Sequence, residues 1–229
     1  MTKTQKVLNI IIIGVIIPLL LVLGVTFFKD RSFLLISILI ASFALIPVFI
    51  AFESKETPTR RLVVLATLIA ISVIGRIIFA AIPGFKPVTA IVVIAAIFFG
   101  PEAGFLVGSL SALVSNVFFG QGPWTPFQMV AWGLLGFLAG LPYIRHKLRT
   151  NRLLLAIYGV FAGIAFSLIM DIWTAMSLDG TFKLNRYIAL VSLSIPFMIV
   201  YAISNVIFLL LTIKPIGNTL TRLKRKYGI

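Results

Sequence analysis

Long apolar runs follow one another along nearly the whole chain, and they restrict its fold more than any other feature. They lie at about 7–28, 32–52, 60–82, 88–99, 101–119, 124–143, 153–178 and 187–212. In lipid, only helices and closed barrels satisfy the backbone, and these runs lack the strict alternation of barrel strands. The sequence therefore predicts an all-α integral membrane protein. No Ala-x-Ala-like cleavage site follows the first run, so we expect that run to be retained.

The short run at 88–99 is interpreted from the basic residues around it. Its 12 residues rise only about 18 Å, less than a hydrocarbon core. If it crosses the membrane, fourteen Lys and Arg residues lie on one side and five on the other. If it does not, nine of those fourteen, the ones from Arg145 onward, change sides and the bias inverts. The positive-inside rule therefore predicts eight crossings in the cell membrane, with both termini cytoplasmic.

The formal net charge of +14 has a simple explanation in such a topology. Cations at the cytoplasmic surface bind anionic lipids, which we expect as partners, and each gains about 1 kcal/mol. We expect no nucleic-acid partner, although the tail reads RLKRKYG. Cysteine is absent, and the single histidine, His146, is expected in a solvated basic loop. We therefore expect no metal site and no resident cofactor.

The chain divides at the polar segment ESKETPTRR, residues 53–61. Residues 1–59 form an N-terminal transmembrane hairpin and a cytoplasmic linker, and their helices carry few polar residues. Residues 60–229 form a six-helix core with a basic tail, and they hold nearly all intramembrane polar residues and small-residue motifs. We expect the function to reside in this second part.

Small residues recur at helical spacing in the core. The sets are Ala66 with Ala70, then Gly100, Gly104, Gly108 and Ala112, then Gly136 with Gly140, and Gly159 with Gly163. Such faces allow helices to approach closely in lipid. Each set can serve packing inside the chain or docking of a second protein, and the sequence leaves both open.

A candidate ligand site lies near the outer ends of the core helices. Asn116 continues the glycine ladder, so it faces an interface or a cavity. The segment Thr125–Gln128 fits a helix start with Thr125 as N-cap and Gln128 reaching back, while Gly120-Gln121-Gly122-Pro123 resembles a flexible lid. Arg76 and Asp171 are intramembrane charges that either pair or contact a ligand. The expected ligand-binding residues are Arg76, Lys86, Asn116, Gln121, Trp124, Gln128, Trp132 and Asp171.

The chain lacks several motifs that catalysis would require. It has no GxxxxGK[ST] phosphate loop, no HExxH and no GxSxG sequence. Asp171 is the one clearly intramembrane carboxylate. We therefore expect no catalytic residue and no enzyme activity in this chain.

Three stretches resemble one known family. They are the AxxxA of Ala66 and Ala70, the segment FFGPEAG at 98–104, and the run from Asn116 to Gly140. Residues 60–213 resemble the S component, the substrate-binding membrane subunit, of energy-coupling factor (ECF) vitamin transporters. The resemblance implies a six-helix fold that captures a vitamin outside the cell. It also implies docking through Ala66 and Ala70 onto a transmembrane T component that carries two cytoplasmic ATPases.

The QGPWTP segment is most similar to members that take up cobalamin, so cobalamin is the expected ligand. Queuosine or another vitamin is an alternative within the same fold. A self-contained secondary transporter is another alternative, and it would work without ATP or partners. A membrane enzyme acting on a lipid is a third alternative, and it would need a cluster of carboxylates or a metal site.

Overall fold

The computed structural model describes residues 3–20, 59–179 and 182–228, together with 23, 38–39, 42–43 and 46. All regular structure in these residues is helical, which confirms the all-α prediction. The N-terminal part contains α1 (Lys3–Ile11), which continues into the π-helical turn η1 (Ile12–Ile16). The core contains α4 (Thr59–Ile78), α5 (Val88–Phe99), α6 (Pro101–Phe119), α7 (Trp124–Gly140), α8 (Pro142–Thr150), α9 (Arg152–Asp179) and α10 (Leu184–Tyr227).

Four of these helices, α4, α6, α9 and α10, are long and apolar enough to cross a membrane. A fifth span results if α7 and α8, bent by 79°, are counted together. The apolar helix at Val7–Leu20 and α5 are shorter. Most of the second expected run, 32–52, lies outside the described residues. The chain is therefore a multi-pass membrane protein, and the eight expected crossings are tested only in part.

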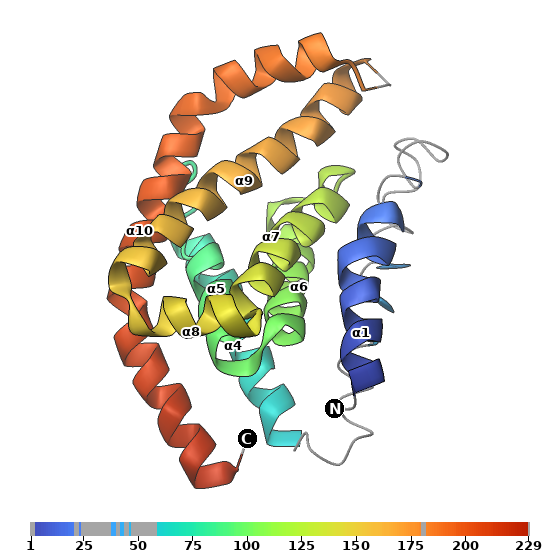
Figure 1. Ribbon diagram of the computed structural model, residues 1–229. Coiled ribbons are helices and arrows are strands. Elements are labelled where there is room, and N and C mark those ends of the chain that lie inside the picture. Colours follow the sequence, from blue (N-terminus) through green and yellow to red (C-terminus); the bar gives the residue numbers. More distant parts are fainter. Residues whose placement is uncertain are drawn as a thin grey trace.

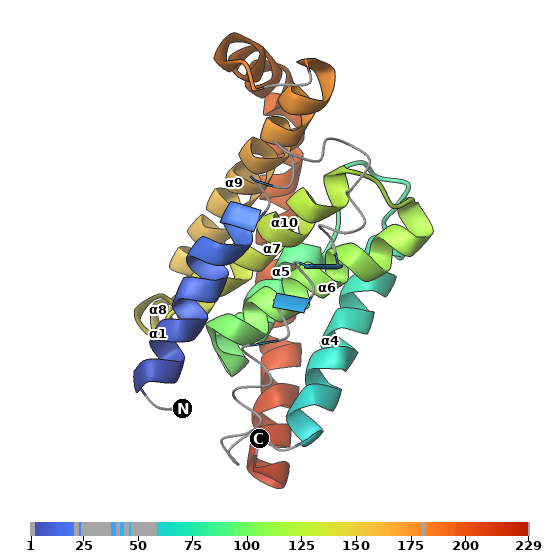
Figure 2. The same cartoon turned by 90° about the vertical axis from the view of Figure 1, so that its right-hand side faces the viewer.

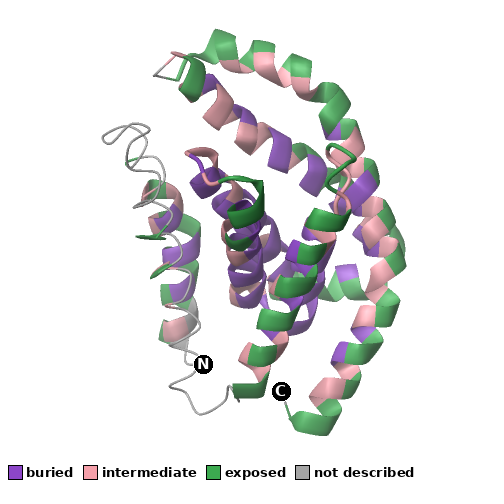
Figure 3. Ribbon diagram, turned by 180° about the vertical axis from the view of Figure 1, so that it is seen from behind, coloured by how far each residue is buried: buried purple, intermediate pink, exposed green. Residues whose placement is uncertain are grey.

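The short helix α5 is the centre of the core. All twelve of its residues are buried, and it packs against α4, α6, α7 and α10 (Figure 3). Arg76 near the end of α4 bonds Ser115 near the end of α6, so the C-terminal ends of these two neighbours lie together. The chain must therefore return between them. Complete burial explains why α5 is apolar on every side.

The chain enters the bundle interior before α5 begins. The backbone N–H of Lys86 donates to Ser204 Oγ of α10 at 2.9 Å, and the Ser204 hydroxyl donates to the Lys86 carbonyl at 3.2 Å. Residues 79–87 thus cover part of the distance between the two ends of the bundle. Twelve helical residues are enough for the remainder, which is why α5 is shorter than its neighbours.

Close packing inside the chain explains the glycine ladder. A Cβ added at Gly104 would lie 2.5 Å from the Gly136 carbonyl oxygen, and one at Gly108 would lie 2.5 Å from that of Trp132. A Cβ at Gly163 would lie 2.6 Å from the backbone nitrogen of Ala202. The helix pairs α6–α7 and α9–α10 therefore approach to backbone contact. These glycines pack internally, which removes docking of a second protein as their function.

Three expectations about element boundaries were wrong. The expected loop around His146 is the helix α8, because Pro142 favours the first helical turn and Leu148 is buried beneath it. The last helix continues past the expected end at 212 as far as Tyr227, although it contains Pro196 and Pro215 (Figure 1). The first core helix ends at Ile78, and the following residues form turns rather than more helix.

One end of the bundle carries most of the described cations, and we call it the basic end. There α4 and α8 contribute Arg60, Arg61, Arg145, Lys147 and Arg149, and α10 contributes Arg222, Lys224, Arg225 and Lys226. Helix α1 begins and α10 ends at this end of the molecule (Figure 1). The N-terminal part packs on the core through the buried side chains of Ile13 and Ile17. The Asn9 amide also donates to Glu102 Oε1, at 3.4 Å.

Candidate ligand-binding site

A polar network joins three core helices at the end opposite to the basic end. Arg76 Nη1 of α4 donates to Ser115 Oγ at 2.5 Å and to Asn116 Oδ1 at 2.9 Å, both in α6. The Asn116 amide nitrogen donates to Thr125 Oγ1 and to Gln128 Oε1 of α7, each at 2.9 Å. Asn116 is fully buried, as the glycine ladder predicts. Every polar atom of its side chain is therefore used in holding α4, α6 and α7 together.

The loop before α7 is ordered by the same network. Gln121 Nε2 donates to the Leu113 carbonyl at 2.8 Å, and Gln121 Oε1 accepts from the Thr125 hydroxyl at 3.0 Å. The ring of Trp124 covers Gly122, where an added Cβ would lie 2.3 Å from it. Gln121 and Trp124 thus fasten the loop to the helix ends. In this state the segment is not a free lid.

The expected cap at the start of α7 was wrong. The helix begins at Trp124 with Pro123 before it, and no side chain makes a cap hydrogen bond. Thr125 lies in the first turn, and Gln128 accepts a hydrogen bond from Asn116 instead of reaching back. The reason is tertiary: the buried amide nitrogen of Asn116 needs acceptors, and Thr125 and Gln128 supply them.

An aromatic cluster lies beside this network. Trp132 of α7, only 1% exposed, stacks on Phe166 of α9 with the ring centroids 4.8 Å apart. Tyr201 of α10 meets the edge of Phe166 at 5.3 Å. The Arg76 guanidinium lies 5.3 Å from the centre of the Trp132 ring. Arg76 therefore belongs both to the polar network and to the aromatic cluster.

Lys86 occupies the middle of the aromatic cluster. Its Nζ lies 4.9 Å from the ring centre of Tyr201, 5.4 Å from Trp132 and 5.6 Å from Phe166. Burial, together with the nearby charge of Arg76, lowers the pKa of Lys86 to about 7. The site therefore holds two basic side chains, Arg76 and Lys86, that differ in basicity and lie among three aromatic rings. Near neutral pH the charge of Lys86 can change, whereas Arg76 stays charged.

The lowered pKa predicts a pH-dependent stability. An unfolded chain protonates Lys86 near its ordinary pKa of 10.5, so from about pH 7 to about pH 10 the unfolded state binds more protons and stability rises with pH. Lys86→Met lacks this contribution. The Tm of the wild type in detergent, relative to that of Lys86→Met, should rise by several degrees across this range. Lys214→Met, which removes an exposed lysine, should leave the pH profile unchanged; parallel curves for wild type and Lys86→Met would contradict the prediction.

Asp171 lies apart from this site. Its carboxylate accepts a hydrogen bond from Ser194 Oγ of α10 at 2.6 Å. Of the two alternatives that the sequence left open for these charges, pairing is not observed, because the structure shows no ion pair or hydrogen bond between Asp171 and Arg76. Trp173 nearby packs against Phe127 with the ring centroids 5.9 Å apart. Asp171 therefore links α9 to α10, and Arg76 has its partners on α6.

The structure brings Arg76, Lys86, Asn116, Gln121, Gln128 and Trp132 together, places Trp124 in the loop beside them and leaves Asp171 outside their hydrogen-bond network. Sequence reasoning missed Ser115, Phe166, Tyr201 and Ser204. Polar Ser204 inside the apolar run at 187–212 was an available signal, and Tyr201 lies three residues before it on the same helical face. Phe166 gave no signal, because phenylalanine is common in apolar helices.

Ala66 and Ala70 lie on a different surface. Both are exposed on α4, unlike the internal glycines, and they form a shallow strip of small side chains with Val63 and Ile74 beside them. Packing inside the described part of the chain does not account for them. We call this strip the α4 face.

The site suits a particular kind of ligand. Arg76 and Lys86 are donors, three aromatic rings lie beside them, and no carboxylate of the described residues bonds to this network. A planar, uncharged or anionic molecule with hydrogen-bond acceptors would match these groups. Arg76 and Lys86 connect four helices. A ligand bound to them would therefore affect how the helices of the bundle pack.

A comparison with protein families matches residues 56–221 to the ECF-type riboflavin transporter, S component. The match covers well over half of the chain, and the chain belongs to this family. It is therefore a substrate-binding membrane subunit of an ECF transporter rather than an enzyme, and the family implies T and ATPase partner subunits. The comparisons with curated proteins and with solved structures gave no match.

Proposed function

We propose that this chain captures riboflavin or a closely related flavin and delivers it through an ECF transporter. The cluster of Trp132, Phe166 and Tyr201 with Arg76 and Lys86 is the observation that supports a flavin. A flavin ring is planar and carries several carbonyl and ring-nitrogen acceptors, which match stacked rings and two cationic donors. The riboflavin description of the family supports the same choice.

Cobalamin is the second candidate, and the QGPWTP segment favours it. Both polar atoms of the Gln121 side chain, however, already make hydrogen bonds inside the chain. A corrinoid would have to replace those bonds, whereas a flavin could use the Arg76 and Lys86 donors with the loop kept in place. This difference is why we rank the flavin first.

The proposal places the basic end in the cytoplasm, since cations gather on that side of membrane proteins. The ligand site then faces the outside, where a scavenged vitamin arrives. The exposed α4 face, with Ala66 and Ala70, serves as the docking surface for the T component. Close approach of a partner helix needs small side chains, and these two alanines provide them.

The ligand can be identified from the purified chain. The chain is produced in cells supplied with both riboflavin and cobalamin, washed extensively in detergent, and examined by visible absorption and by mass spectrometry of the extracted ligand. A stoichiometric flavin spectrum supports the proposal. A corrinoid spectrum would identify the ligand as cobalamin instead of riboflavin. A chain without any bound vitamin would count against both.

Two variants then test the site itself. Arg76→Gln and Lys86→Gln should each weaken vitamin binding by about ten-fold or more, as expected when a buried charged donor is lost. The matched control Arg152→Gln removes an exposed cation at the start of α9. Circular dichroism and gel filtration would establish that each variant is folded. Equal affinity in all three variants would place the vitamin elsewhere.

A further inference from the structure

A groove between α4 and α10 lies outside the ligand site and has a volume of about 360 Å³. Its lining comes from Val64, Thr67, Leu68 and Ile71 of α4 and from Pro215, Ile216, Thr219, Leu220 and Leu223 of α10. Both helices pack against α5, and α4 begins and α10 ends at the basic end (Figure 2). The groove thus occupies the half of the bundle next to the basic end.

The groove is more apolar than its composition implies. The hydroxyl of Thr67 donates to the Val63 carbonyl at 2.8 Å, and that of Thr219 donates to the Pro215 carbonyl at 3.0 Å. Both hydroxyls are therefore satisfied within their own helices. The remaining lining side chains are aliphatic, so the groove offers no free polar group to a polar ligand.

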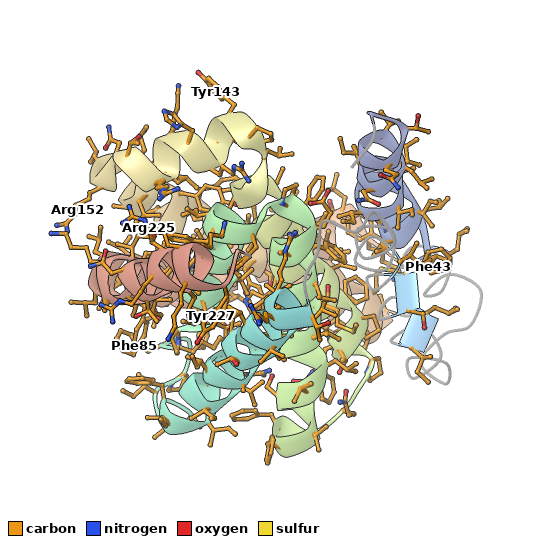
Figure 4. All side chains as sticks on the ribbon, turned by 90° about the horizontal axis from the view of Figure 1, so that it is seen from below. Phe43, Phe85, Tyr143, Arg152, Arg225 and Tyr227 are labelled. Carbon is orange, nitrogen blue, oxygen red and sulfur yellow. The ribbon has the colours of Figure 1, made fainter. Side chains whose placement is uncertain are left out.

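Three cations stand at the mouth of this groove, within about one helical turn of its lining. The Arg61 Nη2 atom donates to the Phe99 carbonyl at 2.6 Å, and Lys224 Nζ donates to the Phe98 carbonyl. Arg60 is exposed and lies 5.2 Å from the ring centre of Tyr227, which stands between the ends of α10 and α4 (Figure 4). A guanidinium has five donors and an ammonium has three, so each of these groups keeps donors to spare.

These cations have no carboxylate of the described residues within ion-pair distance. Among the described residues, Asp179 forms ion pairs with Lys183 and Arg186. These pairs lie at the end of the molecule opposite to the basic end. Glu102 acts on Arg61 only from beyond ion-pair distance. An apolar groove that ends in cations without an ion-pair partner among the described residues is complementary to an acyl chain with an anionic headgroup. We propose that the groove binds one anionic phospholipid, with an acyl chain along Thr67 and Thr219 and its phosphate at Arg60, Arg61 and Lys224.

The dimensions favour an acyl chain over a partner helix. The lining residues of α4 and α10 each span roughly 10 Å along the helix. A partner helix with its side chains is about 10 Å in diameter. A single extended hydrocarbon chain is narrower. This lipid site is separate from the vitamin site, and its test does not depend on the proposed function.

The experiment uses the full chain in neutral detergent. Native mass spectrometry follows the binding of phosphatidylglycerol and of phosphatidylcholine with the same acyl chains. Arg60→Gln and Lys224→Gln remove mouth cations, and Arg225→Gln is the matched control because it removes an exposed charge from the adjacent position of α10. Thr219→Trp fills the groove without touching the cations. Arg60 makes no hydrogen bond to the described part of the fold, so its variant keeps the test valid if Lys224→Gln does not fold.

The proposal expects one phosphatidylglycerol to bind in preference to phosphatidylcholine, with affinity about five-fold lower for each mouth cation removed. Arg225→Gln should keep wild-type affinity, and Thr219→Trp should lose the bound lipid. An equal effect of Arg225→Gln would show a diffuse basic surface and overturn the proposal. Binding of inorganic phosphate that survives Thr219→Trp would show a site for a free anion. A wild-type chain that binds no lipid, together with loss of T-component binding in Thr219→Trp, would assign the groove to that partner. Either result would overturn the lipid assignment.

Discussion

Ala66→Trp or Ala70→Trp is expected to reduce vitamin uptake by the assembled transporter about ten-fold or more, because an indole prevents close helix approach. Both alanines are exposed on the α4 face and have no part in the polar network around Asn116. Vitamin binding by the isolated chain should therefore be unchanged. Uptake into proteoliposomes containing the whole transporter and ligand binding in detergent measure the two properties separately.

Val160→Trp is the matched control for this experiment. Val160 is an exposed residue of α9, 41% accessible, on a different side of the bundle. The tryptophan there should leave uptake at the wild-type level. Loss of ligand binding in Ala66→Trp, or equal loss of uptake in Val160→Trp, would remove the α4 face from the docking surface.

Gly108→Ala is expected to disrupt the fold and the ligand site together. Its new methyl group would lie 2.5 Å from the backbone of Trp132, and backbone atoms cannot rotate away. Helices α6 and α7 must then separate, which costs about 1–3 kcal/mol or more. The displacement moves Trp132 away from Phe166 and Lys86, so the bound vitamin should be lost as well. Thermal unfolding and ligand binding in detergent measure both effects.

Gly14→Ala supplies the comparison for this second prediction. An added Cβ at Gly14 meets no atom of the described residues within 4 Å. Alanine favours helix more than glycine does, so this variant should be as stable as the wild type or slightly more stable. A Gly108→Ala chain that keeps its Tm and its ligand would contradict the prediction. It would show that α6 and α7 can move apart at little cost in stability.

The position of the site could be predicted only in part. Asn116 was found because it continues the spacing of Gly104 and Gly108, and helical periodicity is a property of the sequence. Phe166 and Tyr201 could not be found in this way. They belong to α9 and α10, and their meeting with Trp132 depends on how helices far apart in the sequence pack.

The partners of Arg76 and Asp171 show the same limit of prediction from the sequence. The sequence indicates that two charges lie inside the membrane, and burial requires partners for both. It does not say which partners. The packing of α4 against α6 gives Arg76 the side chains of Ser115 and Asn116, and that of α9 against α10 gives Asp171 the hydroxyl of Ser194.

Sequence alone determined the class of protein. Apolar runs of membrane length force helices, because unpaired backbone groups are too costly in lipid, and the small-residue motifs and the run from Asn116 to Gly140 indicate the S-component family. Only the tertiary structure decided that the glycines of α6 and α7 pack internally while Ala66 and Ala70 stay exposed. It also decided that Lys86 enters the aromatic cluster and that a groove forms between α4 and α10. Each of these outcomes depends on contacts between separate helices, and periodicity along one helix carries no information about its neighbours.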